Sequence, residues 1–211
     1  MAATVLKNSV RALCAAAALS LAPAANAAIN IYTASLSGPN ESPANNSPGT
    51  GSAIVTIDTT ANTMRVQVNF SGLTSGTIAS HIHAATAVPL TGTAGVATTL
   101  PTFPNFPLGV TSGTYDSTFD LLTAGSYNPA FVSANGGTPA SAEAALLAAI
   151  GAGRSYLNIH TTNFTGGEIR GFLTAVPEPA SWMMMLIGFG AVGMVIRRRK
   201  GSLGRLEPAR L

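Results

Sequence analysis

The residues with the clearest chemical potential in this 211-residue chain are its three histidines. His81 and His83 lie two positions apart, and His160 lies in a second segment of similar character. Imidazole nitrogens are common ligands of zinc and copper, and a carboxylate such as that of Glu168 can complete a ligand set of this kind. One hypothesis is therefore a zinc or copper site built from His81, His83, His160 and Glu168.

These side chains can meet only if extended backbone positions them. Side chains two positions apart on a strand project from the same face, so His81 and His83 would lie opposite Ile82. In the same way Glu168 and Arg170 would lie opposite Ile169. If the strands are neighbours, one polar face collects His81, His83, Asn158, His160, Glu168 and Arg170.

A polar face of this composition also has a purely structural interpretation. The histidines and Asn158 would then form cross-strand hydrogen bonds, and Glu168 would pair with Arg170 or Arg154. The residue types alone do not decide between this interpretation and the metal site.

Hydrolytic chemistry has weaker support in the sequence. Asp116 and Asp120 lie four positions apart and would share one face of a strand, whereas a glycosidase needs two carboxyl groups that face each other across the scissile bond. The chain contains no G-x-S-x-G motif and no phosphate-binding glycine loop with a lysine. We therefore expect a domain that does not catalyse a reaction.

The elements that must position the polar face are short strands. Residues 64–70 alternate apolar and polar side chains, which is the pattern of a strand with one buried face. Similar signals, separated by Gly, Pro or Asn, recur at 29–37, 53–58, 77–83, 114–121, 155–161 and 168–173. This organisation favours an all-β domain, an antiparallel β-sandwich of the immunoglobulin-like or superoxide-dismutase-like kind.

Two segments depart from the strand pattern. Residues 138–150 predict one short helix, because Thr138 suits the N-cap, Pro139 the first helical position, and an Ala-rich run follows. Residues 88–109 are rich in Pro, Gly and Thr and predict a long loop, which Phe103 and Phe106 would attach to the body.

The N-terminal residues 1–27 have the features of a secretory signal peptide. Lys7 and Arg11 supply a basic region, residues 12–21 an apolar region, and Ala25-Asn26-Ala27 a small-residue cleavage pattern. The mature chain is expected to begin at Ala28.

The C-terminus carries a second targeting signal. Residues 180–196 are free of charge and would form ~26 Å of helix, close to the ~30 Å hydrocarbon core of a bilayer, so we expect a transmembrane segment. The basic cluster after it should stay in the cytoplasm with the tail 201–211, which places the domain outside.

This C-terminal arrangement over 176–200 resembles the PEP-CTERM sorting signal of exopolysaccharide-making Gram-negative bacteria. The residues that carry the resemblance are Pro177, Glu178, Pro179, Trp182, Arg197, Arg198 and Arg199. The resemblance implies a transient anchor in the inner membrane, processing by an exosortase-type protease, and delivery to the cell surface or extracellular matrix.

Charge limits the partners of the domain at 28–175. It contains three arginines, no lysine and six acids, so its net charge is −3, and the basic character of the whole chain belongs to the targeting segments. Three arginines cannot neutralise the several phosphates that a DNA-binding protein contacts, so nucleic acid is not an expected partner. Cys14 falls in the signal peptide, and a domain without cysteine must be stable through packing alone.

The domain itself resembles the CHRD domain over about residues 30–174. The matching segments are Ser35-Leu36-Ser37-Gly38-Pro39-Asn40-Glu41 with Pro43, Gly72-Leu73, His81-Ile82-His83, Tyr156-Leu157-Asn158-Ile159-His160-Thr161 and Gly166-Gly167-Glu168-Ile169-Arg170-Gly171. The resemblance implies a β-rich extracellular module. The His-x-His segment is also similar to the copper-binding strand of Cu/Zn superoxide dismutases, but those enzymes use more histidines than this domain contains.

Together these observations predict an exported, non-catalytic module of the cell surface or biofilm matrix, with exopolysaccharide or surface proteins as partners. A zinc- or copper-binding domain is the alternative. The two differ in whether the three histidines hold an ion.

Overall fold

The computed structural model describes residues 29–177, 186–194 and 197. The predicted signal peptide 1–27 lies outside these residues, as do Glu178, Pro179, Trp182, Arg198 and Arg199. Residues 186–194 are helical, but the described residues contain no helix that is both long and apolar enough to cross a membrane. The predicted span 180–196 falls partly outside the described residues.

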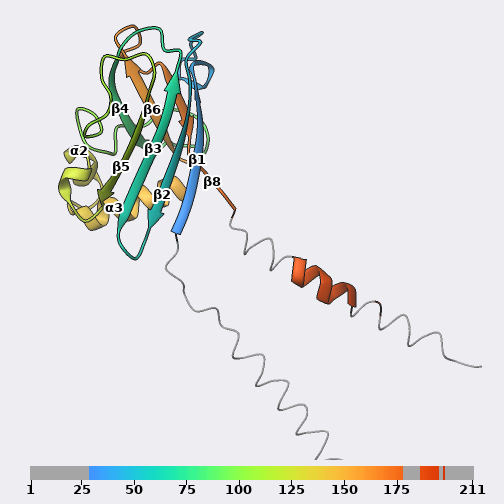
Figure 1. Cartoon of the computed structure of the whole chain (residues 1–211). Helices are drawn as coiled ribbons and strands as arrows, with labels where there is room; N and C mark the ends of the chain where they lie inside the picture. Colours follow the sequence, from blue (N-terminus) through green and yellow to red (C-terminus); the bar gives the residue numbers. More distant parts are fainter. Residues whose placement is uncertain (1–28, 178–185, 195–196, 198–211) are drawn as a thin grey trace, which may run out of the picture.

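Residues 29–175 form an antiparallel sheet of eight strands in the order β4-β6-β7-β1-β2-β3-β5, with β8 paired to β1 (Figure 1). The strands are β1 (Ile29–Ser37), β2 (Thr50–Asp58), β3 (Thr63–Ser71), β4 (Thr77–Ala84), β5 (Gly113–Asp120), β6 (Ser155–Thr161), β7 (Ile169–Phe172) and β8 (Thr174–Ala175). The predicted all-β antiparallel class is confirmed.

The sheet is one continuous, curled layer rather than two separate sheets. β7 meets β1 through a single residue pair, Ser37 with Arg170. The backbones come very close there, since a Cβ atom on Gly171 would lie 2.3 Å from the carbonyl oxygen of Ser35. Only glycine allows this approach, which joins the β4-β6-β7 half to the β1-β2-β3-β5 half.

The core follows the alternation read from the sequence. Met64, Val66, Val68 and Phe70 are buried, whereas Arg65 and Asn69 between them are exposed. β2 and β3 form a hairpin. At its turn, Asp58 accepts hydrogen bonds from the backbone NH groups of Thr60 and Ala61, which fixes the register of the two strands.

The predicted helix is present as α3 (Pro139–Gly151), and Thr138 and Ser141 form a capping box at its start. A second helix, α2 (Pro129–Ala134), packs beside α3 and was not predicted, because six residues are too few for a periodic signal. Two 3₁₀ turns, η1 (Gly38–Asn40) and η2 (Ala124–Ser126), complete the described elements.

The predicted long loop connects the two edges of the sheet. The backbone of this loop forms hydrogen bonds along the free edge of β4; for example, the NH of Phe103 donates to the carbonyl of Ser80. The Phe103 ring then packs on Tyr115 and Phe119 of β5 at centroid distances of 5.6 and 5.4 Å. Phe103 and Phe106 are buried, as predicted, and the loop covers both the core and the edge of β4.

Candidate metal centre

The three histidines meet on the face of β4 and β6 that points away from the apolar core. In the β4–β6 register His81 lies opposite Asn158, and His160 lies opposite Ala79. The ring centroids are 5.9 Å apart for His81 and His83, 5.4 Å for His81 and His160, and 6.0 Å for His83 and His160. The sequence prediction of one shared polar face is therefore correct for the three histidines.

Each imidazole is held by one hydrogen bond to a backbone carbonyl. His81 Nε2 lies 2.6 Å from the oxygen of Pro101, His83 Nδ1 lies 2.9 Å from that of Ala94, and His160 Nδ1 lies 2.9 Å from that of Thr165. A carbonyl oxygen only accepts hydrogen bonds, so each of these nitrogens carries the proton.

The second nitrogen of each ring then carries a lone pair. These atoms, His81 Nδ1, His83 Nε2 and His160 Nε2, are buried and have no hydrogen-bond partner. Leaving a buried polar atom unpaired is costly, so the concentration of three such atoms calls for an explanation.

The rings are neutral at physiological pH. Burial lowers the pKa of all three imidazoles, and it lowers that of His83 to about 4. His83 also stacks on Tyr156, with ring centroids 4.7 Å apart and planes 7° apart. Neutral, oriented imidazoles are the form that binds metal ions.

The geometry is compatible with one shared ion. One ring nitrogen of each histidine lies within 4.8 Å of those of the other two. Ligands of a tetrahedral zinc ion, at ~2.0–2.1 Å from the metal, are roughly 3.4 Å apart, so small rotations of the rings would close the site. The carbonyls of Pro101, Ala94 and Thr165 already supply the outer hydrogen bonds that fix such ligands.

Glu168 does not belong to this group of side chains. Its Oε1 accepts hydrogen bonds from Ser47 Oγ at 2.6 Å and the NH of Thr74 at 2.7 Å, and its Oε2 accepts one from Thr161 Oγ1 at 2.5 Å. Burial raises the pKa of this carboxyl, but these hydrogen bonds outweigh the effect and lower the pKa below its usual value. Glu168 thus fastens three segments together beside the site.

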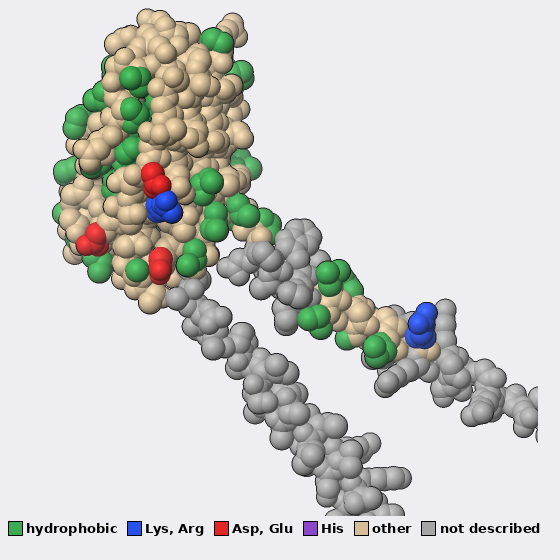
Figure 2. Space-filling model, viewed as in Figure 1, with side chains coloured by type: hydrophobic (Ala, Val, Ile, Leu, Met, Phe, Trp, Pro, Cys, Tyr) green, Lys and Arg blue, Asp and Glu red, His purple; other side chains and the backbone are tan. Residues whose placement is uncertain are grey.

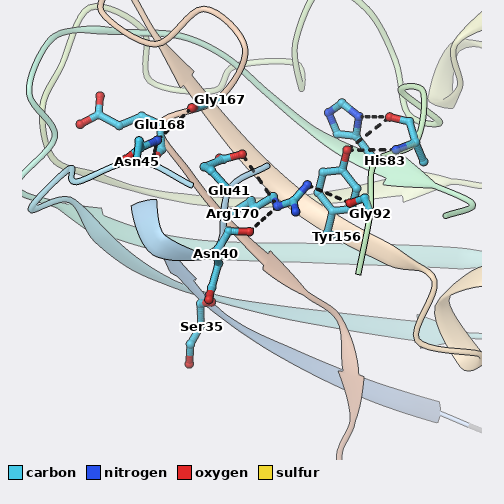
Figure 3. A network of polar contacts seen from close by, with 11 residues as sticks. Ser35, Asn40, Glu41, Asn45, His83, Gly92, Tyr156, Gly167, Glu168 and Arg170 are labelled. Atoms are coloured by element: carbon cyan, nitrogen blue, oxygen red, sulfur yellow. Dashed lines mark hydrogen bonds and ion pairs between the residues drawn. The ribbon is translucent and has the colours of Figure 1, made fainter. Parts of the chain in front are cut away.

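The ion pairs proposed for Glu168 are not formed either. Arg170 Nε instead lies 3.8 Å from a carboxylate oxygen of Glu41 and donates to the carbonyl of Asn40 at 2.5 Å (Figure 3). Its guanidinium also lies 4.7 Å from the centre of the Tyr156 ring. Arg154 donates through Nε to the carbonyl of Thr86.

Glu41 is the residue that the sequence reasoning missed. It follows η1, far from the histidines in the chain, and is buried beside Arg170. Burial raises the pKa of Glu41 to about 7, although the charge of Arg170 opposes the shift. Its Oε1 and the Oδ1 of Asn158 are also buried without a partner. The sequence offered two signals: an acid in a domain of few charges, and the place of Glu41 in a segment that resembles the CHRD domain.

The carboxylates considered for hydrolysis face solvent. Asp116 accepts hydrogen bonds from Arg65 at 2.8 and 2.5 Å, and Asp120 accepts bonds from the NH of Leu122 and the hydroxyl of Thr123. Figure 2 shows one face of the body, on which charged side chains are few. Both carboxylates therefore have local structural partners.

Comparison with known families matches both parts of the chain. The model of the CHRD domain matches residues 32–173, and the model of the PEP-CTERM protein-sorting motif matches residues 175–200. No curated protein and no solved structure matches the chain.

Proposed function

Since this chain belongs to the CHRD domain family, we propose that it is a surface domain that binds one zinc or copper ion through His81, His83 and His160. The observation that carries the proposal is the meeting of the three imidazoles: one ring nitrogen of each lies within 4.8 Å of those of the other two, and each ring has one buried nitrogen without a partner. The ligand set consists of nitrogen only, which suits zinc and copper better than the oxygen-seeking ions magnesium and calcium.

The proposed role of the ion is binding and stabilisation, not turnover. All three histidines are buried, and the segment 92–101 contacts His81 and His83 through the carbonyls of Pro101 and Ala94. An ion at this position would hold β4, β6 and their cover together in a domain that has no disulfide.

The sorting motif supports a location outside the inner membrane for this domain. A PEP-CTERM motif marks an exported protein that passes the inner membrane and is processed by an exosortase-type system in Gram-negative bacteria. We further propose cleavage near Pro177 to Pro179 and incorporation into the extracellular matrix, where exopolysaccharide or surface proteins would be its partners.

Metal content tests the proposal. The full chain, purified in detergent, is stripped with a chelator, equilibrated with Zn²⁺ or Cu²⁺, dialysed and analysed by mass spectrometry beside the His81→Ala/His83→Ala double variant. Asp116→Asn, on the exposed face, is the control. We expect one ion per chain in the wild type and control and none in the double variant. A wild type that retains neither ion would overturn the proposal.

A further inference from the structure

The buried polar face contains more unpaired atoms than three histidines explain. Five of the six buried, unpaired side-chain atoms among the described residues belong to the histidines and to two neighbouring residues. The atoms are His81 Nδ1, His83 Nε2, His160 Nε2, Asn158 Oδ1 and Glu41 Oε1. The two oxygens require a hydrogen-bond donor that the protein does not supply.

Asn158 connects the histidines with Glu41. In the sheet it lies directly opposite His81 on one side and Arg170 on the other. Residues opposite each other in an antiparallel pair have Cβ atoms about 4.5–5.5 Å apart, so the side chains of Asn158 and His81 leave the sheet side by side.

Gly167 brings the two oxygens together. A Cβ atom at Gly167 would lie 2.5 Å from Asn158 Nδ2, 2.6 Å from Asn158 Oδ1 and 2.7 Å from Glu41 Oε1, so the amide and the carboxyl both border the space that this glycine leaves free. The φ angle of Gly167 is 131°, which other residues rarely adopt. The turn is thus built to let the amide and the carboxyl approach one another.

Charge and coordination number both require something more at the metal. Three neutral imidazoles leave the two positive charges of a divalent ion uncompensated, and Arg170 adds a third positive charge nearby. Zinc with three protein ligands keeps a fourth position, commonly occupied by water. Glu41 is outside the three-histidine group, so its carboxylate would act through that water and not as a direct ligand.

We propose that the fourth position of the metal holds a water molecule whose protons are donated to Asn158 Oδ1 and Glu41 Oε1. This inference rests on the proposed metal site and adds a defined exchangeable ligand, water or a small anion such as azide. A hollow of about 580 Å³, lined by Glu41, Asn40, Arg170 and Gly92 among others, lies on the Glu41 side of the site.

Affinity and spectroscopy of the full chain test this assignment. The variants are Glu41→Gln, which keeps the shape of the side chain, Asn158→Ala, and the double variant. Glu143→Gln is the matched control, because Glu143 is also a buried acid but lies on α3. Zinc affinity is measured by competition with a chromophoric chelator, and the fourth ligand is followed by the visible spectrum of the Co²⁺ form with and without azide.

We expect each single variant to bind zinc about 10- to 100-fold more weakly, the usual effect of losing an outer-shell partner. The double variant should lose less than the product of the two single losses, since both residues hold one water. The Co²⁺ spectrum should change in both variants and stay unchanged in Glu143→Gln.

The outcomes separate this inference from the proposed function. If the wild type binds no metal, the metal site itself is wrong and this inference falls with it. If the wild type binds zinc tightly while Glu41→Gln and Asn158→Ala keep its affinity, its Co²⁺ spectrum and its azide response, the metal site stands. The proposal of a water molecule held by Asn158 and Glu41 is then wrong.

Discussion

The two faces of the β4-β6-β7 half-sheet are both buried, yet they differ in how completely their atoms are satisfied. On the inner face Ile82, Leu157 and Ile159 have no exposed surface and pack in the apolar core. On the outer face His81, Asn158 and His160 retain between 2 and 9% exposure, and each has an unpaired polar atom.

The difference indicates what each face is for. Apolar contacts need nothing beyond shape complementarity, so the inner face is complete within the protein. On the outer face, polar atoms are buried away from water without all of their hydrogen bonds. This destabilises the folded state, and a bound ion would remove the cost.

The largest effect should come from the inner face. Leu157→Ala removes a fully buried side chain from the core and should lower the free energy of unfolding by about 2–5 kcal/mol. Urea denaturation checks this value with and without chelator. The decrease in the free energy of unfolding should be the same in both conditions. A decrease that appears only with metal bound would show that the two faces are not independent.

Acid should act on the outer face of the metal-free protein. The pKa of His83 is about 4 in the folded state, against an ordinary value of 6.5. The unfolded chain therefore gains a proton first as the pH falls, and stability that is complete above pH 6.5 is lost down to pH 4, by on the order of 3 kcal/mol. Denaturation midpoints between pH 8 and 4 measure the slope. An equally steep slope in His83→Ala would refute the assignment.

Metal should stabilise the wild type through the outer face alone. Zinc at a free concentration 100 times its Kd should raise the free energy of unfolding by about 2.7 kcal/mol. His83→Ala should lose this gain, whereas Leu157→Ala should keep it despite its lower stability. Thermal unfolding with added zinc shows the pattern, and a zinc-dependent shift that survives in His83→Ala would argue against the site.

The smallest effect should come from a pair that neither face contains. Arg65 and Asp116 form an exposed ion pair, and such pairs contribute little because water and salt screen them. Asp116→Asn should leave metal affinity unchanged and barely move the urea midpoint, with any shift smaller at high salt. A marked loss of metal binding would show that the control is not neutral.

Much of the framework could be predicted because local patterns determine it. Alternation located β3, and the Thr138-Pro139 start located α3. The spacing of His81 and His83 placed them on one face. In each case the signal lies within a few residues of the feature it predicts.

The parts that could not be predicted depend on contacts between distant segments. Glu168 lies two positions before Arg170, so the sequence placed both on one face of a strand. Glu168 in fact precedes β7, and its carboxylate accepts hydrogen bonds from Ser47 and Thr161 instead of joining the histidines. Glu41 reaches the site only because β7 pairs with β1, which brings η1 beside Arg170. No periodicity encodes that pairing.

The central claim is that His81 Nδ1, His83 Nε2 and His160 Nε2 coordinate one ion. Anomalous diffraction from crystals of the zinc-loaded protein, collected at the zinc edge, tests it atom by atom. We expect one strong peak about 2.0–2.1 Å from each of these three nitrogens, with the carbonyl hydrogen bonds of the rings retained. A peak elsewhere, or no peak among the histidines of a folded chain, would contradict it.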